Sequence, residues 1–204
     1  MRPTNFGLLF DVFSKPNPVD LAYTPRELTP HTDNPYRRPV PSIQFLHCLE
    51  NDATGGESTL VDGLAAFEDY AASDPEGHAV LRQTHVTYKY RFGNEHLSSR
   101  SPILETDLEG NFIGIRDSDR LDFVDAVDPD TLDVFYRARL RLRRMLNDPN
   151  RRALFLLRKG DLLMMDNRRL LHGRLPYSLE SGSRHLQGCY IEHDGAELLW
   201  HRLC

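Results

Sequence analysis

Short apolar segments separated by glycine, proline, asparagine and aspartate recur along this chain of 204 residues, and they constrain its fold more than any other feature. The segments are rich in β-branched, aromatic and leucine residues. We predict strands at residues 6–13, 43–49, 59–61, 86–92, 112–115, 153–157, 162–165 and 185–191. Many short strands at uneven spacing favour a sandwich or barrel over a parallel sheet. The sequence therefore predicts a mainly β fold with one substantial core.

Two segments have helical spacing instead. Asp128 followed by Pro129 is typical of an N-cap and a first helical turn, and apolar residues continue at helical spacing as far as Leu146. Asp62 is placed to begin a second helix that runs to Tyr70. We interpret the arginines of the first helix as a solvated face; they are Arg137, Arg139, Arg141, Arg143 and Arg144.

Charge and hydropathy exclude several classes of partner. The formal net charge of -5 gives no basic surplus to neutralise phosphates, so we expect no nucleic acid. No apolar run approaches the roughly 20 residues of a membrane span, and the N-terminus lacks the apolar core of a signal peptide. The cysteines Cys48, Cys189 and Cys204 have no metal-ligand spacing, and we predict a cytoplasmic location.

A proline-rich stretch at residues 16–41 predicts an irregular loop system rather than a core strand, and it contains a His-x-Asp pair, His31 and Asp33. A second histidine, His172, follows the predicted strand at residues 162–165. Two neutral imidazoles and one carboxylate on one face of Fe(II) leave three positions open, which a bidentate oxo-acid and O2 require. Arg184 could pair bidentately with the far carboxylate of that acid. His-x-Asp alone is a weak signal, because a lone histidine is more often structural.

The sequence resembles the γ-butyrobetaine/trimethyllysine dioxygenase family, within the broader taurine-dioxygenase-like superfamily. The resemblance covers nearly the whole chain, and its most specific blocks are residues 166–174 and 184–190. Further matching blocks lie at residues 5–7, 21–24, 31–33, 44–48, 55–58 and 61–63. The family fold implies a double-stranded β-helix, a jelly roll with the metal at its open mouth.

The same resemblance implies site residues and a reaction. His31, Asp33 and His172 match the ligands of Fe(II), Arg184 matches the arginine that binds 2-oxoglutarate, and Ser58 matches a hydroxyl that assists it. Thr59 is the near alternative, and Ser58 could instead bond its own turn backbone. The implied reaction uses O2 and 2-oxoglutarate, releases succinate and CO2, and hydroxylates a small substrate.

An aromatic cage for a trimethylammonium group is implied by Phe6, Phe10 and Tyr23, with Tyr190 as a less certain neighbour. A cation over each ring gains about 0.5–2 kcal/mol. The alternative is that Phe6 and Phe10, four residues apart in a predicted strand, are simply core.

The other end of the expected substrate site departs from the family. Asp20 and Ser118 stand where the γ-butyrobetaine enzymes carry asparagines, and Asp20 would repel an anion unless it is protonated or paired. Arg116 and Arg120 could receive a carboxylate or phosphonate, or they could pair with Asp20, Asp117 and Asp119. Trimethyllysine and 2-trimethylaminoethylphosphonate therefore compete with γ-butyrobetaine as substrates.

We expect residues 1–204 to form a single catalytic jelly-roll domain that lacks the N-terminal region usual in the family. A missing strand would leave a sheet edge uncovered, for which a homodimer is one remedy. Two other functions stay open. One is a dioxygenase of a small sulfonate or other anion, and the other is a non-catalytic jelly-roll binding module.

Overall fold

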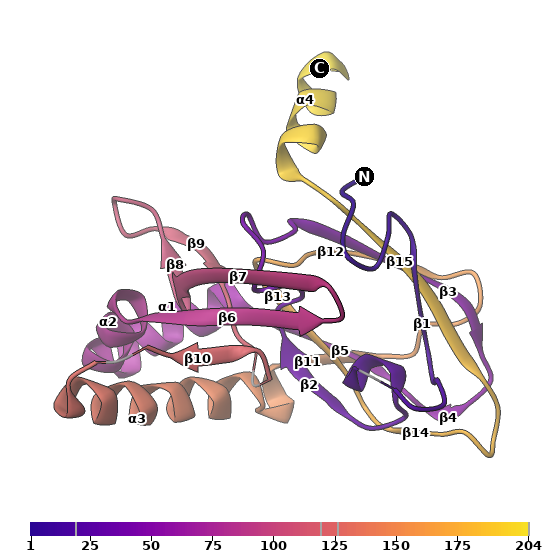
Figure 1. The fold of residues 1–204 in the computed structure, drawn as a ribbon, viewed down its shortest axis with the longest axis horizontal. Helices are drawn as coiled ribbons and strands as arrows, with labels where there is room; N and C mark the ends of the chain where they lie inside the picture. Colours follow the sequence, from indigo (N-terminus) through magenta and orange to yellow (C-terminus); the bar gives the residue numbers. More distant parts are fainter. Residues whose placement is uncertain (19, 119, 126, 204) are drawn as a thin grey trace.

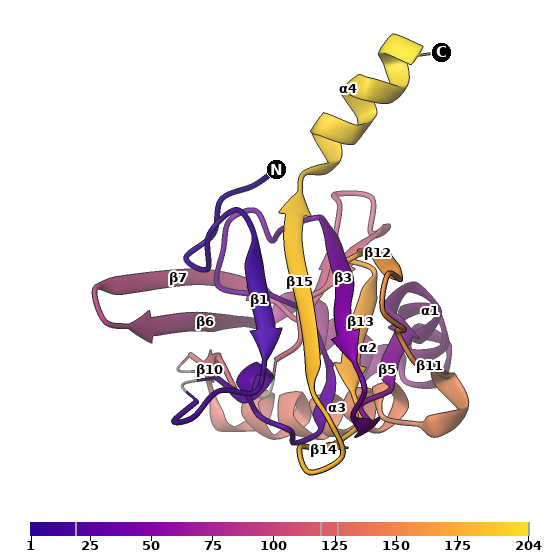
Figure 2. The same ribbon diagram turned by 90° about the vertical axis from the view of Figure 1, so that its right-hand side faces the viewer.

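Two four-stranded sheets stand at the centre of the computed structural model, which describes residues 1–18, 20–118, 120–125 and 127–203 (Figure 1). Both sheets are antiparallel throughout. The larger has the order β1 (Phe10–Phe13), β15 (Arg184–Ile191), β3 (Ile43–Asn51) and β12 (Leu162–Asp166). The smaller has the order β11 (Arg152–Phe155), β5 (Ser58–Asp62), β13 (Leu170–Arg174) and β2 (Leu28–His31). The large sheet lies in front of the small one in Figure 2, as the predicted jelly roll requires.

Residues of both sheets form the core between them. Leu46, Cys48 and Leu186 from the large sheet and Met165 from its edge are buried together with Leu157. Their side chains alternate with outward-facing ones along each strand, as in β15, where every second residue is buried. The pair β4 (Thr54–Gly55) and β14 (Tyr177–Ser178) lies at one end of the sheets.

Each of the eight predicted strand segments contains a strand, and the first is shorter than predicted. β1 begins at Phe10 because Thr4 and Gly7 exchange backbone hydrogen bonds of 3.1 and 3.0 Å, which closes a tight turn before it. Gly7 has a φ of 103°, a conformation that glycine adopts without strain.

The prediction of an irregular loop throughout residues 16–41 is wrong at β2. This strand lies at the edge of the small sheet and pairs with β13 alone. An edge strand tolerates Pro30, since one side of its backbone needs no ladder partner. Its last residue, His31, lies opposite His172 of β13. Among the other described residues of this stretch, the structure has the short 3-10 helix η1 (Leu21–Tyr23).

Helices and a second set of strands pack beside the small sheet (Figure 1). The predicted helices are confirmed as α1 (Gly63–Ser73), capped by Asp62, and α3 (Pro129–Leu146), capped by Asp128. The sequence reading missed α2 (Pro75–Gln83). The strands here are β6 (His85–Phe92), β7 (Glu95–Pro102), β8 (Leu104–Thr106), β9 (Phe112–Ile115) and β10 (Asp122–Val124). The remaining elements are η2 (Pro149–Arg151) and α4 (His193–Leu203).

The arginines of α3 do not all lie on a solvated face, so that prediction is wrong in part. Arg137, Arg141 and Arg144 are exposed. Arg139 instead pairs with the buried Asp122, and Arg143 pairs with the buried Asp117 at 3.2 Å. The reason is the segment before α3, where Asp117 follows β9 and Asp122 begins β10, because both aspartates lie against the helix.

Packing of α3 gives a stability prediction. Leu142 is fully buried in the cluster beneath the helices, whereas Leu140 on the same helix is 57% exposed. We expect Leu142→Ala to lower the free energy of unfolding by about 2–5 kcal/mol, since it leaves a cavity. Leu140→Ala should change it by less than about 0.5 kcal/mol. Urea denaturation of both variants checks this, and equal losses would contradict the packing of α3.

The C-terminal helix α4 projects away from the sheets beyond the end of β15 (Figures 1 and 2). None of its described residues is buried. None of the described helices combines the length and apolar character that crossing a bilayer requires.

Candidate metal centre and adjoining pocket

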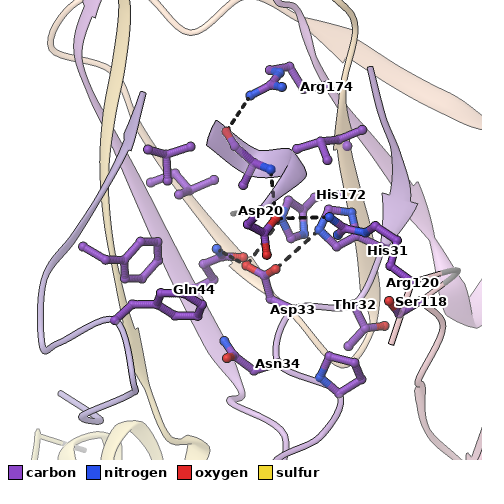
Figure 3. A pocket seen from close by; sticks show the side chains of 18 of the residues that line it. Asp20, His31, Thr32, Asp33, Asn34, Gln44, Ser118, Arg120, His172 and Arg174 are labelled. Carbon is purple, nitrogen blue, oxygen red and sulfur yellow. Dashed lines mark hydrogen bonds and ion pairs between the residues drawn. The ribbon is translucent and has the colours of Figure 1, made fainter. Parts of the chain in front are cut away.

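Three predicted ligands come together at the mouth of the small sheet. His31 ends β2, His172 lies in the middle of β13, and Asp33 follows two residues after His31. Nε2 of His31 lies 3.4 Å from Oδ1 of Asp33, and Nε2 of His172 lies 3.6 Å from Oδ2. One ligand atom from each residue lies within 4.8 Å of the others. Figure 3 shows the three side chains pointing toward one another.

Outer hydrogen bonds orient these groups. Nδ1 of His31 lies 2.9 Å from the Thr29 carbonyl, which leaves Nε2 to face the carboxylate. Oδ2 of Asp33 accepts from Nε2 of Gln44 at 2.8 Å and from the Tyr190 hydroxyl at 2.7 Å. Such outer partners of a metal site fix ligand orientation. The sequence reading missed Gln44, although it lies in a matching block.

Charge states at the site suit a divalent metal. Burial lowers the pKa of His172 to about 4 even though Asp33 opposes the shift, so the imidazole is neutral at neutral pH. Burial alone would raise the pKa of Asp33, but His172, His31 and the Tyr190 hydroxyl outweigh it and hold that pKa below its usual range. Neutral imidazoles and an ionised carboxylate are the forms that bind metal. The donor set is the two-histidine, one-carboxylate set of non-haem Fe(II) oxygenases.

A pocket opens beside the three ligands, and Arg184 and Ser58 both line it. Arg184 begins β15 and is 5% exposed. It has no ion pair within the described residues, and its Nε has no hydrogen-bond partner there. A buried cation without an anionic partner is costly, so this arginine suits an anionic ligand. Thr59, the alternative to Ser58, does not line the pocket.

The Gly55-Gly56 turn before Ser58 allows this arrangement. Gly56 has a φ of 77°, and a Cβ built there would lie 3.1 Å from Cδ of Arg184. A larger residue would therefore be strained and would also displace the arginine.

The predicted cage residues Phe6, Phe10, Tyr23 and Tyr190 all line the same pocket. Phe10 stacks on Tyr190 with ring centroids 5.2 Å apart and lies 6.3 Å from Phe6. Phe6 and Phe10 are half-buried rather than buried, although Phe10 also packs against the core between the sheets. Phe10 therefore contacts both the core and the pocket.

Two further rings in the pocket were missed by sequence reasoning. Tyr90 of β6 lies 5.9 Å from Phe6, and Tyr36 stacks on Tyr90 at 4.8 Å. Tyr36 lies three residues after Asp33, and this short distance along the chain was a signal that its ring lies near the metal ligands. Nothing in the sequence indicated that the β6–β7 hairpin reaches this pocket.

At the other end of the pocket, Asp20 pairs with Arg120, as one of the sequence alternatives expected. Oδ1 of Asp20 accepts from Nη1 of Arg120 at 3.2 Å, and both residues line the pocket (Figure 3). Ser118 also lines it, and its buried Oγ has no hydrogen-bond partner in the described structure. Asp119 lies outside the described residues.

Arg116 does not lie in this pocket, so its assignment as a substrate contact needs correction. Nη2 of Arg116 lies 2.6 Å from Oε1 of Glu105, and Nη1 donates to the Pro35 carbonyl and to Ser99. The side chain is buried among these partners and faces a different hollow. Glu105 neutralises Arg116, whereas the sequence analysis had named Asp20, Asp117 and Asp119 as its possible partners.

Comparison with known proteins gives matches over most of the chain. The model of the "Taurine catabolism dioxygenase TauD, TfdA family" matches residues 1–190. A γ-butyrobetaine dioxygenase from Pseudomonas sp. (strain AK-1) is 38% identical over 194 residues, covering 95% of this chain and 51% of that protein. A trimethyllysine dioxygenase from Meyerozyma guilliermondii is 31% identical over 200 residues, covering 95% and 49%. The chain thus spans about half the length of the curated relatives it matches.

Solved structures share the fold at lower sequence identity. An asparagine oxygenase in complex with Fe(II), 3-hydroxyasparagine and succinate has a TM-score of 0.73 at 18% identity, covering 91% of this chain and 57% of that one. PvcB, an Fe, alpha-ketoglutarate dependent oxygenase from an isonitrile synthetic pathway, has a TM-score of 0.64 at 23% identity, covering 95% and 67%. Both support the jelly-roll architecture.

Proposed function

Because the chain belongs to the taurine catabolism dioxygenase TauD, TfdA family, we propose that it is an Fe(II)- and 2-oxoglutarate-dependent dioxygenase that hydroxylates a small quaternary-ammonium compound. One observation carries the proposal. The pocket contains a complete set of iron ligands together with Arg184, a buried arginine that has no carboxylate partner within the described residues. A metal ion would be held by the ligand set, and the carboxylate of a dicarboxylic oxo-acid would pair with Arg184.

The roles of the residues follow from their places. His31, Asp33 and His172 would hold Fe(II), and Arg184 with Ser58 would hold the distal carboxylate of 2-oxoglutarate. Bound iron supplies the oxidation by O2 that converts 2-oxoglutarate to succinate and CO2 and hydroxylates the substrate. Gln44 and Tyr190 keep the Asp33 carboxylate in place by their hydrogen bonds. The aromatic walls exclude water from the reacting carbon and position it.

The substrate that fits best has a quaternary ammonium at one end and an α-amino acid group at the other, as in trimethyllysine. Phe6, Phe10 and Tyr190 line the pocket and would hold the first group by cation–π contacts. The pair of Asp20 and Arg120 presents a carboxylate and a guanidinium side by side, which complements an ammonium and a carboxylate on one carbon. The substrate γ-butyrobetaine would bring only a carboxylate, which would compete with Asp20 for Arg120 and would bring no ammonium group to Asp20. A phosphonate would bring more negative charge and is disfavoured further.

The test is an assay of the purified chain, loaded anaerobically with Fe(II) and 2-oxoglutarate and then exposed to O2. The panel contains trimethyllysine, γ-butyrobetaine, 2-trimethylaminoethylphosphonate and taurine, and the readouts are succinate and a one-oxygen mass gain. We expect the gain on trimethyllysine first. A gain on taurine alone would favour the small-anion alternative, and no succinate above the metal-free background would leave the non-catalytic binding module.

Replacing Phe10 by leucine tests the aromatic cage. We expect Phe10→Leu to raise KM for the quaternary substrate by about 2- to 30-fold, because it removes one cation–π contact of about 0.5–2 kcal/mol. The neutral analogue with carbon in place of the quaternary nitrogen should lose less. Phe123→Leu is the matched control, since Phe123 is exposed on β10 and outside the pocket. Equal losses for the charged and neutral compounds would point to shape rather than charge.

We also propose a homodimer and a cytoplasmic location. The dimer is supported by β1, which pairs with β15 alone and leaves its other edge unpaired in the described sheet. Cys48 and Cys189 are free thiols, in keeping with a reducing compartment. Sedimentation equilibrium of the full chain tests the dimer, and a single species of 23.5 kDa would rule it out.

A further inference from the structure

Arg174 is a buried arginine that the proposed chemistry leaves without a role. It ends β13, two residues after His172, and it is 4% exposed. Nη2 donates to the carbonyls of Thr24 and Arg26, both at 2.7 Å, and Nη1 donates to that of Ala22 at 3.3 Å. It has no carboxylate partner in the part of the chain that the structure describes. One side chain therefore holds three backbone carbonyls of one short segment.

That segment, residues 20–27, is called the strap below. It contains η1, has no fully buried residue, and contributes Asp20, Ala22 and Tyr23 to the pocket lining. Its other polar anchors include the ion pairs of Asp20 with Arg120 and of Glu27 with Arg152. The Tyr177 amide donates to the Pro25 carbonyl at 3.0 Å, and the Lys15 amide donates to the Tyr23 carbonyl at 3.0 Å. The strap is thus half-buried to exposed, and the buried Arg174 donates hydrogen bonds to its backbone.

Arg174 also lies next to the proposed co-substrate arginine. Its Cζ is 5.0 Å from the Tyr177 ring centroid, and that of Arg184 is 5.9 Å from the same ring. Both guanidinium groups are buried beside one ring, and two cations held in such a site repel each other. A carboxylate bound at Arg184 would offset this repulsion, since opposite charges in a buried site attract strongly.

We propose that Arg174 is a positioning residue that holds the strap, and with it Asp20 and Tyr23, where the substrate needs them, and that a carboxylate bound at Arg184 strengthens this hold. The inference rests on the proposed function. An arginine suits the role because its guanidinium donates in several fixed directions at once, whereas a lysine ammonium is a compact point charge on a flexible stem.

The test compares Arg174→Lys with Arg184→Lys. Arg174→Lys should raise KM for the quaternary substrate by about tenfold, because hydrogen bonds from a charged donor to the strap are lost. Its KM for 2-oxoglutarate and its succinate release without substrate should change by less than about twofold. Arg184→Lys should show the opposite pattern. The matched control is Arg169→Lys, since Arg169 forms an exposed ion pair with Asp62.

A second measurement needs no turnover. Hydrogen exchange followed by mass spectrometry reports on the amides of residues 20–27. We expect faster exchange in Arg174→Lys than in the wild type, and slower exchange in the wild type when 2-oxoglutarate and Fe(II) are added without O2. The slowing should be absent in Arg174→Lys.

Two outcomes overturn the inference. One is wild-type strap exchange that does not respond to 2-oxoglutarate, which can be measured even if Arg174→Lys does not fold. The other is an equal rise of the KM for the quaternary substrate and the KM for 2-oxoglutarate in Arg174→Lys, which would indicate a general structural role. If the wild type binds 2-oxoglutarate and slows strap exchange but releases no succinate, the proposed function fails while the role of Arg174 stands.

Discussion

Replacing His172 by alanine is expected to abolish succinate formation and to weaken Fe(II) binding by more than about a hundredfold. The loss of a hydrogen-bond partner of a metal ligand already weakens metal binding by up to about a hundredfold, and the loss of the ligand itself should weaken it more. Two ligands on neighbouring positions, His31 and Asp33, remain, and two donors do not complete one face of the metal. Equilibrium dialysis with metal analysis measures the affinity, and added Fe(II) should not restore turnover.

The fold should survive this change. His172 borders the open pocket, so its removal enlarges a space that solvent already reaches. His96→Ala is the control, because His96 is exposed at the β6–β7 hairpin. Circular dichroism should be the same for both variants. If His172→Ala still bound Fe(II) tightly, His172 would not be a metal ligand.

Replacing Arg184 by methionine is expected to weaken 2-oxoglutarate binding by about 2–5 kcal/mol, roughly 30- to several-thousand-fold, since truncating one partner of a buried charge pair leaves the other unpaired. Methionine keeps the apolar stem of the side chain and removes the charge. Calorimetric titration of 2-oxoglutarate into the Fe(II)-loaded protein under anaerobic conditions measures the effect.

Fe(II) binding should be unchanged in Arg184→Met, which separates this variant from His172→Ala. Arg151→Met is the control, because Arg151 pairs with Asp69 at the surface. The folded protein should also gain stability without 2-oxoglutarate, since a buried charge with no partner in the described structure is removed. Unchanged affinity for 2-oxoglutarate would transfer the anchoring role to another residue.

The metal site could be predicted from the sequence because its signals are local. His31 and Asp33 stand two residues apart, and the specific block from Asp166 to Arg174 contains the second histidine, although the strand β13 that carries it was not predicted. Eight strands were found for the same reason, since alternation and turn residues act over a few positions. The strands β4, β7, β8, β10, β13 and β14 were not predicted. Strand β2 was missed because proline density favoured a loop, and only its edge position makes the proline harmless.

Contacts between distant segments could not be predicted in the same way. Tyr88 and Tyr90 lie on the same face of β6, yet only the folded hairpin shows that Tyr88 is buried under the helices and that Tyr90 reaches the pocket. Arg116 and Arg120 look equivalent in the sequence, but Glu105 neutralises one and Asp20 pairs with the other. Helical spacing likewise predicted the apolar face of α3, but it did not show that Asp122 and Asp117 pair with arginines of this helix.

The metal ligands and the substrate walls come from different parts of the molecule. Two of the three ligands lie on paired strands of the small sheet, whereas the aromatic and charged walls come mostly from the N-terminal segment with β1, the strap, the β6–β7 hairpin and the loop before α3, with Tyr190 from β15. Mutations can therefore accumulate in the walls while the strands that bear the histidines stay unchanged. Such a division of labour lets a lineage acquire new substrates by exchanging peripheral segments, and it makes those segments the natural targets for directed evolution of a new hydroxylase.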